Sequence, residues 1–161
     1  MSGSSTPRAL GHRSILADPR KKSMRDLVNS KIKFRESFRP FAPVVLAEKA
    51  TDYFVTKSRE KHYPFRFMQY VVPVKKNKES QLGAITHVDG TARPQFIDKN
   101  VNEKYYNLIK SFGEETSVSV LLNTSFNLKG EPIVNTSKEA FSTFKRSGID
   151  VLVLNDYIIE K

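Results

Sequence analysis

The chain has 161 residues, of which 39% are hydrophobic and 27% are charged, a size and composition typical of one soluble globular domain rather than a disordered chain. It contains no cysteine and no apolar run near the roughly 20 residues that span a bilayer, which excludes disulfides, thiol catalysis and a membrane-spanning helix and favours a reducing, cytoplasmic compartment. The net charge of +10 predicts anionic partners, such as phosphate ligands, nucleic acid or an acidic protein surface.

The first dozen residues carry no core pattern. Apolar residues at helical spacing predict a short amphipathic helix over residues 24–32. Two prolines make residues 39–43 an extended segment, because proline fixes its own backbone and restricts the residue before it. Short strands are predicted over residues 44–46 and 70–74.

Two further strands are predicted over residues 84–87 and 92–97, joined by the Asp-Gly turn signal of residues 88–91. The most strongly periodic helix is expected over residues 102–116, with Glu103 as a favourable charge in its first turn. The apolar side chains that share one face of this helix are Tyr105, Leu108, Ile109 and Phe112.

Toward the C-terminus, an apolar run predicts a buried strand over residues 118–122. Ser137 is expected to cap a helix that continues through Lys145. A strand follows over residues 151–154, and residues 157–159 either continue it or pair with it nearby. The irregular alternation of strands and helices predicts an α/β or α+β domain.

A cluster of small polar residues follows the predicted strand 118–122, and Gly130-Glu131-Pro132 comes shortly after it. Asn123, Ser125 and Asn127 alternate, so a locally extended chain would point all three side chains the same way. The end of a strand can present amides and hydroxyls to a ligand, which makes this cluster a candidate binding site.

Residues 31–41 mix cations with aromatic side chains. Arginine binds phosphate in a bidentate manner and lysine supplies a point charge, so Lys33, Arg35 and Arg39 are candidates for an anion site. The rings expected to bury these cations and strengthen their contacts are Phe34, Phe38 and Phe41. The alternative is an exposed basic turn whose aromatic rings lie in the core.

Residues 86–93 are polar where a strand would be apolar. His87, Asp89, Thr91 and Arg93 alternate, which would place a possible acid/base, a carboxylate, a hydroxyl and a guanidinium on one side. The alternative is a hairpin with a polar solvent face. The sequence has no P-loop, no G-x-G-x-x-G and no G-x-S-x-G, and its three scattered histidines predict no metal site.

Four stretches together resemble one family: PRALGHRSILADPR at 7–20, IKFRESFRPFAP at 32–43, THVDGTARPQ at 86–95, and LLNTSFN with GEPIV at 121–127 and 130–134. They resemble the C-terminal domain of the O-carbamoyltransferases that act on nodulation factors, cephalosporins and aminoglycosides. Thr6 stands where the family has glycine, so we interpret residues 1–6 as a tag or a disordered lead and 7–161 as the domain.

The resemblance implies a fold similar to YrdC/Sua5, a twisted mixed sheet with flanking helices around a basic concave cavity. The K-x-R and S-x-N signature of that fold is matched by Lys33-Phe34-Arg35 and Ser125-Phe126-Asn127. In the family this domain makes carbamoyl adenylate from carbamoyl phosphate and ATP, with Mg²⁺ expected to accompany ATP. A separate N-terminal domain, similar to Kae1 and holding a metal, then passes the carbamoyl group to a hydroxyl.

The resemblance also implies roles for single residues. The group expected to be catalytic consists of Lys33, Arg35, Arg93 and His87. The residues expected to bind carbamoyl phosphate are Arg39, Asn123, Ser125 and Asn127, and those expected to bind the nucleotide are His12, Arg13 and Thr91. Two alternatives of other classes stay open: a YrdC-like module that binds double-stranded RNA, and a noncatalytic subunit that serves a separately encoded transfer partner.

Overall fold

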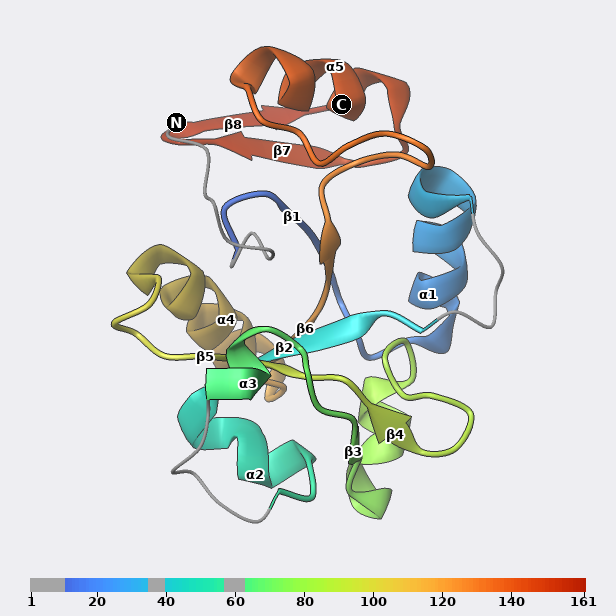
Figure 1. Ribbon diagram of the computed structural model, residues 1–161, viewed down its shortest axis with the longest axis vertical. Helices are drawn as coiled ribbons and strands as arrows, with labels where there is room; N and C mark the ends of the chain where they lie inside the picture. The colour runs from blue at the N-terminus through green and yellow to red at the C-terminus, as the bar shows by residue number, and fades with distance from the viewer. Residues whose placement is uncertain (1–10, 35–39, 57–62) are drawn as a thin grey trace.

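The computed structural model describes residues 11–34, 40–56 and 63–161. Its main element is a four-stranded mixed sheet in the order β1-β6-β2-β5, in which β2 and β5 are parallel and the other neighbours are antiparallel (Figure 1). The strands are β1 (Ser14–Ala17), β6 (Val120–Ser125), β2 (Ala42–Leu46) and β5 (Gln95–Ile97). The predicted α/β class with a mixed sheet is confirmed.

The two faces of this sheet are both buried. Along β2, Val44 and Leu46 belong to one apolar cluster and Val45 to the other, as the two-residue period of a strand requires. The long helix α4 (Glu103–Thr116) covers the first face through Tyr105 and Ile109. Leu108, which was expected on the same face, is exposed instead.

A helix leads from the sheet to the predicted basic segment. It begins as α1 (Lys22–Val28) and continues as the single π-helical turn η1 (Asn29–Lys33), so the helix expected over 24–32 is confirmed with a different ending. Phe34 then takes a left-handed conformation, with φ 47°, that ends the helix. Its ring is 53% exposed, and the expectation that Phe34 buries the cations is wrong, whereas Phe41 is buried.

The predicted strand over 84–87 is wrong. The amides of Ile85 and Thr86 both donate to Leu82 O, at 3.1 and 3.0 Å, and so extend the turns of the 3₁₀ helix η3 (Lys76–Leu82). Ala84 and Ile85 are nevertheless buried, because this turn packs into the core. Their apolar character therefore predicted their burial correctly, but it did not predict their backbone conformation.

The predicted strand over 92–97 is divided in two, and Pro94, which has no amide hydrogen, lies at the break. The first part is β4 (Thr91–Ala92), which pairs with β3 (Val72–Pro73), and the second part is β5. β3 is itself shorter than the strand expected over 70–74, since Val74 forms an isolated bridge with Phe54.

The C-terminal segments follow the expected order. β6 extends past the predicted strand 118–122 to include Ser125, and α5 (Ser137–Arg146) is capped by Thr136 rather than by Ser137. The strands β7 (Val151–Leu154) and β8 (Tyr157–Glu160) pair as an antiparallel hairpin. The remaining short helices are η2 (Ala47–Lys49), α2 (Ala50–Tyr53) and α3 (Tyr63–Arg66). None of the helices in the described ranges is long and apolar enough to cross a membrane.

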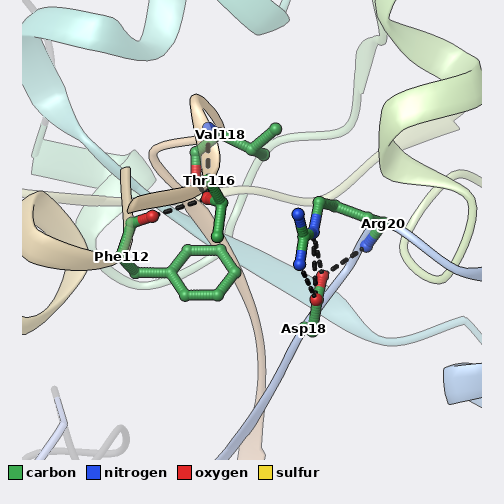
Figure 2. A network of polar contacts seen from close by, with 5 residues as sticks. All are labelled: Asp18, Arg20, Phe112, Thr116 and Val118. Atoms are coloured by element: carbon green, nitrogen blue, oxygen red, sulfur yellow. Dashed lines mark hydrogen bonds and ion pairs between the residues drawn. The ribbon is translucent and has the colours of Figure 1, made fainter. Parts of the chain in front are cut away.

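The turn between β1 and α1 is fixed against the end of α4, as Figure 2 shows. Arg20 donates to both carboxylate oxygens of Asp18 at 2.6 to 3.0 Å, and its guanidinium lies 5.8 Å from the centroid of the Phe112 ring. These hydrogen bonds from Arg20 hold the pKa of Asp18 below its usual value. At the last turn of α4, the Thr116 hydroxyl donates to Phe112 O and accepts from the Val118 amide at 3.3 Å.

The cap of α5 can be tested directly, because sequence and structure name adjacent residues. Thr136 Oγ1 accepts from the Glu139 amide at 3.2 Å, and the Glu139 carboxylate accepts from the Thr136 amide at 3.0 Å, which is a complete capping box. We expect Thr136→Ala to lower the free energy of unfolding by about 1 kcal/mol. Ser137→Ala should change it by less than about 0.5 kcal/mol. Urea denaturation of both variants measures these changes. A larger loss of unfolding free energy in Ser137→Ala than in Thr136→Ala would contradict the assigned cap.

Candidate functional site

The ammonium of Lys33 is the centre of a polar cluster at the end of β6. Lys33 is 7% exposed, and its Nζ donates to Ser125 O at 2.6 Å and Asn127 O at 3.0 Å. Nζ also lies 2.8 Å from Asn127 Oδ1 and 3.3 Å from Ser125 Oγ. The Ser125 hydroxyl in turn donates to Asn127 Oδ1 at 2.6 Å. The structure therefore brings Lys33 together with Ser125 and Asn127.

The loop that follows β6 is closed on itself. Asn127 Nδ2 donates to Glu131 O at 2.7 Å, and the Val134 amide donates to Phe126 O at 3.0 Å. The Glu131 carboxylate accepts from Arg146 at 2.7 Å, which ties the loop to the end of α5. This hydrogen bond keeps the pKa of Glu131 below its ordinary value. The loop thus holds Asn127 in one orientation beside Lys33.

Arg13 and His12 lie just before β1, the strand that pairs with β6. The Phe126 amide donates to Arg13 O at 3.0 Å, and Arg13 Nη1 reaches Val134 O at 3.5 Å. Arg13 therefore borders the same loop as Asn127. His12 is exposed and lies 3.5 Å from the side chain of Asn102, the N-cap of α4.

Asn123 lies inside the sheet. It is 5% exposed, and its Nδ2 donates to Gln95 Oε1 on β5 at 2.7 Å. Gln95 Nε2 then donates to Arg66 O at 3.0 Å. Asn123 is therefore held within the sheet by Gln95, whereas Asn127 is held by the loop beyond the end of β6.

The turn before β4 contains a chain of hydrogen bonds from His87 to Asp89. Thr91 Oγ1 lies 2.7 Å from Asp89 Oδ1 and 3.0 Å from His87 Nδ1. The ionised carboxylate can only accept, so the single hydroxyl hydrogen of Thr91 goes to Asp89 and His87 Nδ1 must donate to Thr91. Neutral His87 then carries its hydrogen on Nδ1 and keeps a lone pair on Nε2.

Three effects act on the charge of His87. Partial burial lowers its pKa most, Asp89 raises it, and the positive charge of Arg93 lowers it, with a net decrease from 6.5. The hydrogen bonds from Thr91 hold the pKa of Asp89 below its usual value. At neutral pH the turn therefore presents a neutral imidazole, an ionised carboxylate and a guanidinium. The imidazole of His87 could accept a proton at Nε2.

The predicted residues fall into separate places on the molecule. In Figure 1, β4 and the loop that leads into it lie at the opposite end of α1 from the loop that follows β6. Lys33, Ser125, Asn127 and Arg13 gather at the β6 end, and His87, Thr91 and Arg93 at the β4 end. Arg35, Arg39 and the ring of Phe38, which was expected to bury the cations, lie outside the described residues.

Three polar residues that the sequence analysis did not assign support this arrangement. Gln95 holds Asn123, Glu131 holds Asn127 through its carbonyl, and Arg146 holds Glu131. Gln95 was detectable as a buried amide in an apolar strand, and Glu131 as part of the Gly-Glu-Pro motif. Arg146 lies 15 residues after Glu131 and had no local signal. Within the described ranges, no group of three or more His, Asp or Glu side chains could hold a metal ion.

Comparison with known proteins places these residues in a family context. The family described as carbamoyltransferase C-terminus matches residues 4–161. Nodulation protein NolNO of Sinorhizobium fredii is 48% identical over 155 residues, which cover 96% of this chain and 22% of that protein. Nodulation protein NolO of Bradyrhizobium diazoefficiens is 46% identical over 96% of this chain and 28% of its own length.

A third similar protein is the 3'-hydroxymethylcephem-O-carbamoyltransferase of Amycolatopsis lactamdurans. It is 37% identical over 152 residues, which cover 93% of this chain and 27% of that protein. The chain therefore spans 22% to 28% of the length of these three relatives.

The buried ammonium can be tested through stability. Lys33→Met removes the donor that is shared by Ser125 O, Asn127 O and Asn127 Oδ1, and leaves these acceptors without it. We expect a loss of about 3 kcal/mol in the free energy of unfolding, measured by urea denaturation. The exposed Lys31→Met is the matched control and should change it by no more than about 0.5 kcal/mol. Equal effects of the two substitutions would show that the contacts of Lys33 contribute nothing to folding.

His87 predicts a pH dependence of stability. Its pKa in the folded protein lies below 6.5, so the unfolded chain binds more protons as the pH falls through that value, and acidification destabilises the fold. The free energy of unfolding should therefore fall between about pH 7.5 and about pH 5.5, before the carboxylates titrate. His87→Asn keeps a donor toward Thr91 and should flatten this slope, whereas the exposed His12→Asn should retain it. A wild-type slope in His87→Asn would exclude His87 as its source.

Proposed function

This chain belongs to the carbamoyltransferase C-terminus family, and we propose that it binds carbamoyl phosphate and ATP and forms carbamoyl adenylate from them. The observation that carries the proposal is the cluster in which Lys33 holds Ser125 and Asn127 at 2.6 to 3.3 Å. It combines a buried cation with neutral amide and hydroxyl groups, which is the chemistry that recognises an amide attached to a phosphate.

The carbamoyl end of the ligand would be read by neutral groups. Within the described part of the chain, Asn127 Nδ2 donates to one acceptor, Glu131 O, so one of its two amide hydrogens remains for a ligand carbonyl. Ser125 Oγ can accept from a ligand amide while it donates to Asn127. The Glu131 loop and Lys33 fix both side chains before the ligand binds. Binding would therefore cost little side-chain conformational entropy.

The proposed reaction must bring two polyanions together. Water cleaves carbamoyl phosphate to carbamate and phosphate, a carbamate oxygen attacks the α-phosphorus of ATP, and pyrophosphate leaves with the electrons of the broken P–O bond. The net products of carbamoyl phosphate, ATP and water are carbamoyl adenylate, phosphate and pyrophosphate. Cations that offset the repulsion and stabilise the developing charge are proposed to be Lys33, Arg35, Arg39 and Arg93.

The nucleotide is assigned to Arg13, which borders the Lys33 cluster, to His12, and to the turn before β4. Arg13 and His12 would contact phosphates, and Thr91 would support His87, whose free Nε2 could accept a proton. Mg²⁺ would accompany ATP and be held mainly by phosphate oxygens and water. Arg35 and Arg39 are proposed as phosphate ligands from the sequence alone, because their guanidinium groups match phosphate geometry and they come shortly after Lys33 in the chain.

Transfer to a hydroxyl is proposed to take place on a separate Kae1-like domain that holds a metal, which we call the transfer domain. Two findings support this division. The similar proteins are about four times longer than this chain, and the name of one of them states O-carbamoyl transfer to a hydroxymethylcephem. The transfer domain could lie in the same polypeptide or in a separate chain.

Calorimetry with carbamoyl phosphate tests the carbamoyl site. Asn127→Ala removes the amide that Lys33 and Ser125 orient, and we expect carbamoyl phosphate to bind at least about tenfold more weakly. Asn107→Ala, at an exposed position on α4, is the matched control and should bind as the wild type does.

ATP–pyrophosphate exchange that depends on carbamoyl phosphate tests the reaction itself. Arg93→Ala should lower the exchange rate by roughly a hundredfold, because it removes a charge from the proposed phosphate side. Unchanged binding in Asn127→Ala would refute the assigned carbamoyl site. Unchanged exchange in Arg93→Ala would refute the role of that arginine.

A further inference from the structure

The outer face of the β7–β8 hairpin is apolar and exposed. In the hairpin register Val153 pairs with Ile158, and Val151 pairs with Glu160, so these side chains share one face. Val151, Val153 and Ile158 are 46%, 64% and 69% exposed. The opposite face, with Leu152, packs into the main core. We refer to Val151, Val153 and Ile158 as the hairpin face.

The three neighbouring aliphatic side chains form one contiguous apolar patch, the kind of surface through which proteins contact one another. An isolated two-stranded hairpin is only marginally stable in water, and this one gains its support from α5 on its inner face. Figure 1 shows α5 lying along one side of the hairpin. The hairpin face is therefore not needed to hold the hairpin on this domain, and it is available to a partner.

The charges around the hairpin face differ from those of the whole chain. Residues 150–161 contain three acids, Asp150, Asp156 and Glu160, and one base, Lys161, in a protein of net charge +10. The Lys161 ammonium donates to Ser147 O and lies 5.0 Å from the centroid of the Phe144 ring on α5, so it is turned toward the inner side. An acidic rim repels nucleic acid, and it would also face itself in a symmetric pair of copies.

The turn of the hairpin is linked to the start of α4. Asp156, in the turn of the hairpin, is 3.7 Å from Lys104 in the first turn of α4. The cap of that helix, Asn102, contacts His12 at 3.5 Å. The turn of the hairpin is thus connected, through the first turn of α4, to the turn that carries His12.

We propose that the hairpin face docks the transfer domain, the part of the longer family members that this chain does not span. This inference rests on the proposed function for the identity of the partner. Three observations favour this occupant: the exposed apolar face, the acidic rim that disfavours nucleic acid and a second copy, and relatives of which the chain covers 22% to 28%. Docking there would bring the acceptor of the carbamoyl group next to the site that activates it.

The probe is the remainder of Sinorhizobium fredii NolNO, produced without the segment that is similar to this chain and used after a cooperative unfolding transition has shown that it is folded. Sedimentation analysis of the fluorescently labelled chain with this probe should show a 1:1 complex. The double variant Val153→Thr and Ile158→Thr keeps β-branched side chains and removes apolar surface, and it should bind at least about tenfold more weakly. Val71→Thr, at a similarly exposed valine away from the hairpin, should bind as the wild type does.

A second variant separates a loss of docking from a loss of folding. Ile158→Lys places a charge on the hairpin face and should abolish the complex while leaving the unfolding midpoint within a few degrees of the wild type. Three outcomes would overturn the proposal: no complex with the wild type, equal affinity in the double variant, or self-association of the wild type that the double variant loses.

Calorimetry with carbamoyl phosphate distinguishes a failure of the proposed function from a failure of the docking proposal. Both hairpin variants should bind carbamoyl phosphate as the wild type does, because the Lys33 cluster lies outside the hairpin. A complex formed by a chain that does not bind carbamoyl phosphate would support the docking surface and refute the proposed chemistry.

Discussion

An ammonium with almost no solvent contact joins the end of η1 to the end of β6. Removing a lysine from water costs several kcal/mol unless hydrogen bonds replace its hydration. Four oxygens of Ser125 and Asn127 lie within 3.3 Å of Lys33 Nζ and provide that replacement. Because two of them are backbone carbonyls, the lysine orients the chain itself at the strand end. The placement of the candidate carbamoyl site depends on this contact.

The rest of the fold supplies rigid support on either side of the cluster. β6 lies between β1 and β2, and the cluster occupies its open end, beyond the last residue that pairs with β2. On the far side, Arg146 fixes Glu131 and so keeps the loop closed around Asn127. An exposed ion pair contributes little to global stability. Here the ion pair acts locally, because it restricts the loop that carries Asn127, the side chain proposed to bind the ligand.

The candidate site is divided between two ends of α1, and a physical reason can be given for the division. In the proposed reaction, carbamoyl phosphate and ATP would be bound by different kinds of side chain. One end offers oriented neutral groups beside a buried cation, and the other offers a neutral imidazole beside Arg93. The hairpin adds a third surface with apolar chemistry. Each of these chemistries therefore lies on a different part of the fold.

The sequence by itself determined the elements with clear local signals: the helix from Glu103, the strand β2, the apolar start of β6, and the family stretches that single out Lys33, Ser125 and Asn127. Periodicity and capping act over a few residues, so they can be read from the chain. Only the tertiary structure decided which partners meet. Lys33 contacts residues 92 and 94 positions away, and Asn123 is held by Gln95 on another strand. The exposure of Phe34, the turn at 84–87 and the bare hairpin face likewise follow from packing between distant segments, which no local pattern encodes.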